Sequence, residues 1–286
     1  MLAESPAGVS IAVRACPLCG GFDSSQEQFR LTGWLQRCQG CDMVFSESAA
    51  IPGTLYEEAF SDTDHFYHRY ADEGEKLLTG AGTHIAWGWR QFFRTVPIPH
   101  GGGRILDIGC STGVFLSEAK RRGWSNVEGI EISPSAAAFA RRLLQCDVHE
   151  MPLESANLPS ERFDTVTVYE VIEHLLDPIG FVREITRVLR RSGTVTFTTP
   201  NWESVWERQS RDVHRAPPYH LNYFTPRTIT KLLTGAGFTD VRTARKPFAW
   251  KEEIGPSAPL HLPLSLLRSA LLGQRGNRLF VTARRD

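Results

Sequence analysis

Apolar and polar positions follow two alternating periods along residues 101–286. Short runs of branched apolar residues, typical of buried strands, are separated by longer stretches in which apolar residues recur every three or four positions, as on one face of a helix. We expect strands at 104–109, 127–132, 163–170, 194–200, 238–246 and 278–285, and helices at 114–123, 134–144, 177–193 and 225–237. This alternation predicts an α/β fold with a doubly wound, mostly parallel sheet and helices on both faces.

Residues that typically start or end helices support several of these boundaries. Gly193 follows one helical stretch as its expected stop, and Thr225 with Pro226 supplies a cap and a favourable first-turn residue for another. In open sheets of this kind, ligands bind beyond the carboxyl ends of the strands. The functional residues are therefore expected in the loops that follow the strands.

The turn after the first strand of this region, LDIGCSTG, has the chemistry of a particular ligand. Asp107 ends the strand, and Gly109 and Gly113 let the backbone turn tightly. A carboxylate there would repel the pyrophosphate that a G-x-G-x-x-G loop binds, but would attract an ammonium group. Glu131 ends the next strand, where a carboxylate suits two ribose hydroxyls. S-adenosylmethionine combines an amino acid and a ribose without a phosphate.

At this point the chain resembles the class I S-adenosylmethionine-dependent methyltransferases, in particular the group with ubiquinone-biosynthesis and natural-product enzymes. The segments that carry the resemblance are LDIGCSTGVFL, GIEIS, PLESANLPSERFDTV, YEVIEHLLDP, LRRSGTVTFTTPN and HLNYFTPRTITKLLTGAGF. The resemblance covers 101–286 and implies a Rossmann-like sheet of seven strands. It departs at Ser111, where the loop often carries a further glycine, but serine is small enough to be tolerated.

The resemblance also implies which residues contact the cofactor. They are Asp107, Gly109, Cys110 and Gly113 at the methionine end, Glu131 and Ile132 at the ribose and adenine, Leu153 and Glu154 at the adenine edge, and Glu170 near the methionine or the reaction centre.

The segment YEVIEHL, residues 169–175, has two interpretations. If it is helical, Glu170, Glu173 and His174 share one face. The two carboxylates would then be stabilised by the positive end of the helix dipole, and His174 would be a packed or capping residue of that helix. The segment also resembles the metal-binding E-x-x-E-H face of RNA 3′-terminal 2′-O-methyltransferases and ubiquinone O-methyltransferases. In that interpretation His220 completes a divalent-cation site.

Methyl transfer requires alignment of acceptor, methyl group and sulfur, and removal of a proton when the acceptor is a hydroxyl. His220 in PPYHLNYFT is our first candidate for the base, because a histidine accepts a proton near neutral pH. Glu170 and His174 are the other candidate catalytic residues. Of the two interpretations of YEVIEHL, we favour the base without a metal.

The first fifty residues have the spacing of a four-cysteine zinc site. Two C-x-x-C pairs, Cys16 with Cys19 and Cys38 with Cys41, stand 18 residues apart around a predicted strand pair. Four thiolates leave no position open for a substrate, so we expect a structural zinc ribbon over residues 1–50. The remaining thiols, Cys110 and Cys146, are unpaired, which together with the knuckles favours a reducing compartment and hence the cytoplasm.

Residues 51–100 are rich in aromatics at near-helical spacing, which indicates helices packed on the main domain, a lid over a small-molecule pocket, or both. The apolar stretch LHLPLSLLRSALLG near the C-terminus suggests a buried or interfacial helix. The expected organisation is therefore a ribbon at 1–50, a helical lid or linker at 51–100 and a methyltransferase domain at 101–286.

Composition limits the partners. Lys and Arg together number 32, as do Asp and Glu, and this zero net charge argues against a broad nucleic-acid surface. No apolar run reaches the roughly 18 residues of a membrane span, and no signal peptide is evident. We expect O-methylation of a small hydroxylated metabolite, sugar or natural product. The alternatives are C- or N-methylation, methylation of an RNA end, and a non-catalytic scaffold.

Overall fold

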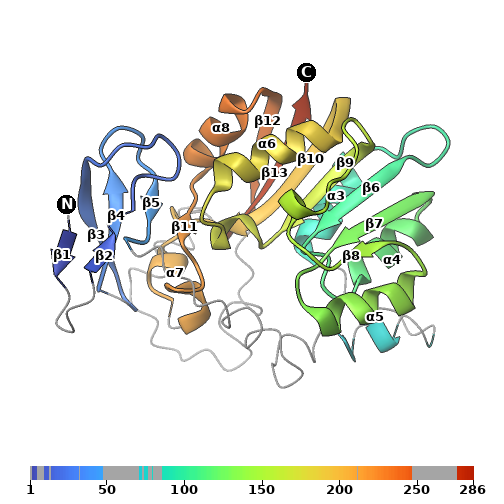
Figure 1. Ribbon diagram of the computed structural model, residues 1–286, viewed down its shortest axis with the longest axis horizontal. Helices are drawn as coiled ribbons and strands as arrows, with labels where there is room; N and C mark the ends of the chain where they lie inside the picture. The colour runs from blue at the N-terminus through green and yellow to red at the C-terminus, as the bar shows by residue number, and fades with distance from the viewer. Residues whose placement is uncertain are drawn as a thin grey trace, which may run out of the picture.

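A seven-stranded sheet forms the centre of the molecule (Figure 1). The structure is a computed structural model that describes residues 2–4, 10–12, 14–31, 33–47, 71–72, 74–76, 79, 86–210, 212–246 and 276–286. The strand order is β12-β13-β10-β9-β6-β7-β8. The bounds are β6 Arg104–Ile108, β7 Asn126–Ile130, β8 Val148–His149, β9 Phe163–Tyr169, β10 Leu189–Pro200, β12 Phe238–Arg245 and β13 Arg278–Arg285. Neighbouring strands run parallel except where β13 pairs with β10 and β12, so the mostly parallel sheet is confirmed.

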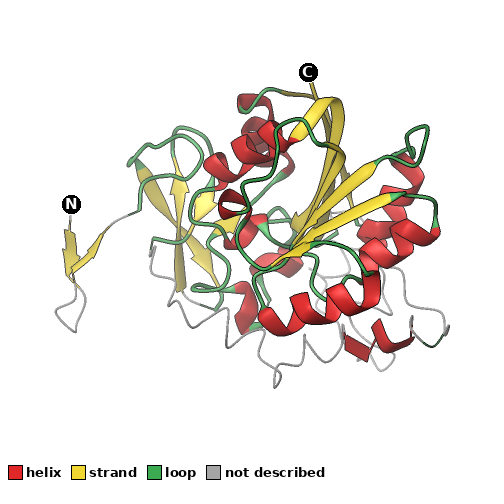
Figure 2. Ribbon diagram, turned by 45° about the vertical axis from the view of Figure 1, so that its right-hand side comes forward, coloured by secondary structure: helices red, strands yellow, loops and turns green. Residues whose placement is uncertain are grey.

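Helices cover both faces of this sheet (Figure 2). Successive strand residues point to opposite faces: Ile105 packs with the helices α3 (Trp87–Thr95), α4 (Val114–Arg121) and α5 (Pro134–Leu144). Leu106 packs on the other face, with α6 (Pro178–Val188) and α8 (Pro226–Gly235). The helix begun by Thr225 is capped as expected, since the Thr225 hydroxyl accepts from the Thr228 amide at 3.2 Å.

One predicted helix boundary is wrong. The helix expected over 177–193 ends at Val188, and Gly193 lies within β10 instead of stopping the helix. Leu189 is extended and fully buried opposite Phe163 of β9, and the pairing shifts register between Leu189 and Thr194. Tertiary pairing therefore overrides the helical pattern of this stretch.

A smaller, four-stranded sheet stands beside the large one (Figure 1). Its order is β11-β5-β4-β3, with bounds β3 Ser24–Phe29, β4 Gly33–Cys38, β5 Val44–Phe45 and β11 Asn222–Tyr223. The antiparallel β3–β4 hairpin confirms the predicted strand pair. The strand β11 comes from the far end of the chain and pairs with β5. The strands β1 (Leu2–Glu4) and β2 (Ser10–Ala12) pair antiparallel in a separate two-stranded sheet.

Residues 71–72 and 74–76 are helical, and several short elements follow later in the chain. They are the helix α7 Val205–Arg208 and the 3-10 turns η1 Leu153–Ser155, η2 Ile172–His174 and η3 Val213–Arg215. Among the residues that the structure describes, no helix has the length and apolarity needed to cross a membrane.

The aromatic helix α3 packs on the main sheet. Phe92 and Phe93 lie 5.2 and 5.6 Å from Phe115 between ring centroids, and Trp87 lies 6.3 Å from Phe280 of β13. Phe66, Tyr67 and Tyr70, three of the aromatic residues of the segment 51–100, lie outside the described residues. The apolar stretch LHLPLSLLRSALLG, residues 260–273, also lies outside them. The lid and the domain boundaries stay predictions.

Candidate active site and metal centre

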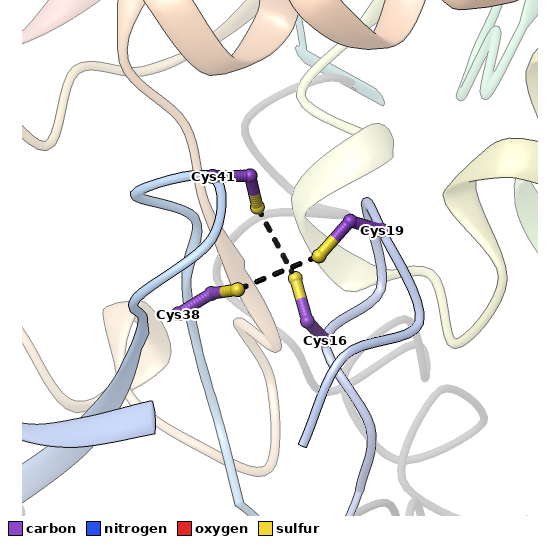
Figure 3. A group of neighbouring side chains, drawn as sticks. All are labelled: Cys16, Cys19, Cys38 and Cys41. Carbon is purple, nitrogen blue, oxygen red and sulfur yellow. Dashed lines mark hydrogen bonds between the residues drawn. The ribbon is translucent and has the colours of Figure 1, made fainter. Parts of the chain in front are cut away.

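The four N-terminal cysteines point toward one another (Figure 3). The Sγ–Sγ distances are 3.4 Å between Cys16 and Cys41 and 3.5 Å between Cys19 and Cys38, and all four sulfur atoms lie within 4.8 Å of one another. Four thiolates at about 2.3 Å from one zinc ion would be roughly 3.8 Å apart. The sulfur atoms are thus close to the edges of a zinc tetrahedron.

The surroundings of the sulfur atoms also suit a bound cation. Cys16, Cys38 and Cys41 are buried. Burial raises the pKa of the Cys16 thiol to about 11. A thiol with this pKa stays protonated at neutral pH unless a cation stabilises its thiolate. The convergence of the four sulfur atoms therefore fits a structural zinc ion, which would stabilise their thiolates.

The expected cofactor residues Asp107 and Glu131 lie at adjacent strand ends. Asp107 in β6 pairs in register with Gly129 of the neighbouring strand β7, and Glu131 directly follows β7. The loop between β6 and α4 turns through Gly109 and Gly113, whose φ values are +75° and +79°. A Cβ atom at Gly109 would lie 2.5 Å from Val171, so a side chain would not fit there.

Glu131 fastens the glycine-containing loop to the next strand. One of its carboxylate oxygens accepts from the Ser111 amide and the other from the Ser133 amide, each at 2.8 Å. The carboxylate is 5% exposed, and burial raises its pKa. Each oxygen keeps a further lone pair, so the carboxylate can still accept from hydroxyl groups of a ligand.

Asp107 is a buried carboxylate without a cation beside it in the described part of the chain. It accepts a 2.6 Å hydrogen bond from the Thr167 hydroxyl. Burial, and to a lesser extent the charge of Glu131, raises its pKa to about 7. A ligand ammonium group would stabilise the ionised form and lower this pKa again. The environment is that of a cation-binding carboxylate.

The other expected cofactor residues have mixed surroundings. Cys110 is buried in the loop after β6, and Leu153 is buried within the core on the α6 side of the sheet. Ile132 is 40% exposed and Glu154 is exposed. All four follow the carboxyl ends of β6, β7 or β8, the edge at which ligands bind in such sheets.

The segment YEVIEHL does not form an α-helix, so the condition under which its three side chains would share one face is not met. Glu170 has a left-handed φ of +55°, and only the single 3-10 turn η2, Ile172–His174, follows. The α-helix begins later, at Pro178, with Asp177 as its cap. The three side chains therefore do not share one helical face. Glu170 instead forms a 2.5 Å ion pair with Arg278 at the start of β13.

Glu173, His174 and His220 nevertheless converge. One potential ligand atom from each lies within 4.8 Å of the others, and the two imidazole rings meet edge to face at 4.8 Å. Glu173 accepts from the Thr199 hydroxyl at 3.1 Å. His174 Nδ1 donates to the Tyr219 carbonyl at 2.8 Å, because a carbonyl oxygen only accepts.

Burial disfavours the charged form of each residue in this cluster. It raises the pKa of Glu173 well above the usual value, with a further rise from Glu170. It lowers the pKa of His174 and lowers that of His220 far more, with nearby cations adding to the effect on His220. Within the described chain, Glu173 Oε1 and His220 Nδ1 have no hydrogen-bond partner. These atoms can bind a substrate proton or a divalent cation.

The comparisons with known proteins decide the family. A family model described as a methyltransferase domain matches residues 67–243, more than half of the chain. The protein belongs to this methyltransferase family. The match begins well before residue 101 and so includes the helix α3.

Individual relatives agree with the family. A Mycobacterium tuberculosis protein named as a probable S-adenosylmethionine-dependent methyltransferase is 32% identical over 138 residues, 48% of this chain and 49% of the relative. A ubiquinone biosynthesis O-methyltransferase of Ralstonia nicotianae is 35% identical over 55% of this chain and 65% of the relative. The chain thus spans about half to two thirds of these relatives.

Solved structures show the same fold. A SAM-dependent methyltransferase from Archaeoglobus fulgidus has a TM-score of 0.55 and 18% identity, covering 78% of this chain and all of that one. At this identity the likeness concerns the fold alone. It agrees with the Rossmann-like α/β sheet of the methyltransferase family described above.

Two charged residues near the candidate site, Arg278 and Glu207, were not singled out from the sequence. Arg278 lies beside Glu170 because β13 runs antiparallel to β10 and pairs Arg278 with Pro200. The buried Glu207 of α7 forms an ion pair with Arg215, and burial raises its pKa to about 7. A charge at the start of a predicted strand was the only signal for Arg278, and the strand's direction was needed to place it.

Proposed function

We propose that the protein transfers a methyl group from S-adenosylmethionine to an oxygen atom of a small hydroxylated metabolite, sugar or natural product. The observation that carries this proposal is the pair of carboxylates, Asp107 and Glu131, at adjacent strand ends beside the glycine-containing loop. Relatives named as O-methyltransferases support the oxygen acceptor. C- or N-methylation of a similar small molecule is the alternative.

In this proposal each residue has a defined task. Asp107 binds the cofactor ammonium group, and Glu131 accepts from the ribose hydroxyls while it holds the loop through the Ser111 amide. Bound S-adenosylmethionine supplies an electrophilic methyl group. His220, neutral because burial depresses its pKa, takes the acceptor proton. Its Nδ1 has no partner in the described part of the chain and is the atom that we assign to this step.

Two measurements on purified protein test the proposal. Calorimetry should show binding of S-adenosylmethionine that weakens in Asp107→Ala and Glu131→Ala. Incubation with methyl-labelled cofactor and a panel of polyols, phenols, amines and short RNAs should label a hydroxylated small molecule. Labelling of amines alone or RNA alone would show that the acceptor is not a hydroxylated small molecule. Absence of cofactor binding would overturn the enzyme assignment.

A metal-assisted reaction is the second candidate. The convergence of Glu173, His174 and His220 within 4.8 Å favours it, because a carboxyl group and two imidazoles are side-chain types that bind divalent cations. The cation would polarise the acceptor oxygen when bound. The metal-free base stays our principal proposal, since the fourth expected ligand, Glu170, is ion-paired with Arg278.

A further proposal concerns the N-terminal unit and the compartment. We propose that Cys16, Cys19, Cys38 and Cys41 hold a structural zinc ion, for which their convergence is the support. The lone thiols Cys110 and Cys146 favour a cytoplasmic location, where thiols stay reduced. Zinc analysis of the purified protein at one ion per chain would support the site, and a metal-free, stable protein would overturn it.

A further inference from the structure

Arg14, two residues before the first zinc-ligand candidate, reaches the reaction centre. Its Nη1 donates to the Leu221 carbonyl at 3.1 Å. Its Nη2 donates to the Leu176 carbonyl at 2.8 Å, to the Leu175 carbonyl at 3.3 Å and to Asn222 Oδ1 at 3.1 Å. One guanidinium group therefore joins the end of η2 to the segment that carries His220.

The acceptors of Arg14 are the immediate neighbours of the candidate catalytic residues. Leu175 directly follows His174, and Leu221 directly follows His220. The two segments also bind each other, because the Leu221 amide donates to the Glu173 carbonyl at 2.8 Å. The Asn222 side chain adds a 2.7 Å hydrogen bond to the Leu175 carbonyl.

A second bridge runs through the N-terminal sheet. The strand β5 pairs with β11 in the register Phe45 to Asn222 and Val44 to Tyr223. The Ser46 amide extends this ladder with a 2.9 Å hydrogen bond to the Leu221 carbonyl. In Figure 1 β11 lies next to β5, and the strand order makes it the edge strand of the small sheet.

The cysteine side chains share a hydrophobic core with the same region. Cys16 and Cys41 pack in one cluster with Phe45, Ile172 of η2 and Phe224, which follows β11. Cross-linking the cysteines through a metal would therefore stiffen the surface on which η2 and β11 rest. The N-terminal unit therefore contacts the reaction centre in three ways: through Arg14, through β5 and through this core.

We propose that the N-terminal four-cysteine unit positions the reaction centre, with Arg14 as the positioning residue that fixes Glu173, His174 and His220 relative to one another. The inference rests on the proposed function. Physically, it states that Arg14 holds η2 and the segment that carries His220 in one fixed arrangement. A planar guanidinium with five donors can serve four acceptors from different segments, whereas a lysine ammonium has only three donors. The unit thus acts in catalysis without supplying a reacting group.

Hydrogen exchange of the full-length, zinc-loaded protein tests the proposal. In Arg14→Ala we expect the amides of His174 and Leu221 to exchange about 10- to 150-fold faster, the factor that corresponds to lost hydrogen bonds of a charged group. Exchange in β3 and β4, and the affinity for S-adenosylhomocysteine measured by calorimetry, should change less than twofold. Arg14→Lys should give an intermediate exchange rate.

Arg227→Ala is the matched control. Arg227 also joins the main domain to the N-terminal unit, through a 2.6 Å ion pair with Asp42, but it belongs to α8 and not to η2 or the segment that carries His220. Faster exchange at His174 and Leu221 in Arg14→Ala alone supports the proposal. Equal exchange in both variants, or faster exchange throughout β3 and β4, overturns it. If Arg14→Ala is insoluble, Arg14→Lys is compared with Arg227→Ala by the same criteria.

These outcomes are separable from the proposed function. A protein that binds no S-adenosylhomocysteine but shows the local change at His174 and Leu221 would refute the methyltransferase assignment and keep the positioning role. If the protein binds S-adenosylhomocysteine but hydrogen exchange is unchanged in Arg14→Ala, the methyltransferase assignment is kept and the positioning role is refuted.

Discussion

The two halves of the candidate site are built in different ways. In the cofactor half, Asp107 and Glu131 come from adjacent parallel strands, and their carboxylates accept hydrogen bonds from Thr167 and from backbone amides of the turns beside them. In the acceptor half, η2 and the segment before β11 meet only through tertiary contacts, and two polar atoms of the described cluster stay without a partner.

This difference separates what is common to a family from what distinguishes its members. The cofactor half needs only a strand end, a tight loop and a neighbouring strand, so any chain with this sheet can build it. The acceptor half depends on segments outside the sheet, including Arg14 and the strand β5. Changes to the N-terminal unit should therefore disturb the acceptor half first.

The largest expected effect follows from removal of a zinc ligand. Structural zinc binding contributes on the order of 10 kcal/mol. Cys41→Ser should therefore release the metal and either abolish soluble expression or lower the melting temperature by at least about 10 °C, since each kcal/mol shifts it by about 2–4 °C. Zinc analysis and thermal unfolding measure both effects. Cys146→Ser, which alters a lone half-buried thiol, should keep its zinc; equal behaviour of the two variants would contradict a structural zinc site.

The next effect distinguishes the two interpretations of the acceptor half. If His220 is a metal-free base, His220→Ala should lose about 10²- to 10⁴-fold in methyl transfer with unchanged cofactor affinity. His174→Ala should then mainly lower stability, and a chelator that leaves the ribbon zinc bound should not change the rate. Equal losses in both variants, with activity lost to the chelator and restored by Mg²⁺ or Mn²⁺, would establish the metal-assisted reaction instead.

The same contrast explains how much could be predicted from the sequence. The strands and the Asp107 to Glu131 arrangement follow from contiguous patterns, because hydrophobic period and turn residues are local properties. The left-handed backbone of Glu170 could not be predicted, because helical spacing in YEVIEHL does not reveal it. The strand β11, only two residues long, forms because β5 offers it an edge, and no local signal marks that pairing.

Substitution in the cofactor half should cost less than loss of the base. Asp107→Ala or Glu131→Ala should weaken S-adenosylmethionine binding by about 1.5–3 kcal/mol, the range for hydrogen bonds that involve a charged group. Calorimetry measures the change, and His220→Ala serves as the control from the other half. Unchanged affinity in both carboxylate variants would refute their assignment to the cofactor.

The smallest effect is a pH dependence confined to the cofactor half. Burial raises the pKa of Asp107 to about 7, so in the free protein its carboxyl group is protonated at pH 6 and must lose that proton to bind an ammonium group. Cofactor affinity should therefore fall by up to about tenfold for each pH unit below 7 and level off above it. Because the folded-state pKa lies above the unfolded value, the stability that this group contributes to the free protein is full below about pH 4 and is lost as the pH rises through 7. Bound cofactor should reverse that trend by stabilising the ionised form.

Calorimetry in buffers of different ionisation enthalpy should detect proton release on binding at pH 6, and Asp107→Asn should abolish it. Proton release that persists in Asp107→Asn would assign the titration to another group and remove Asp107 from the ammonium site.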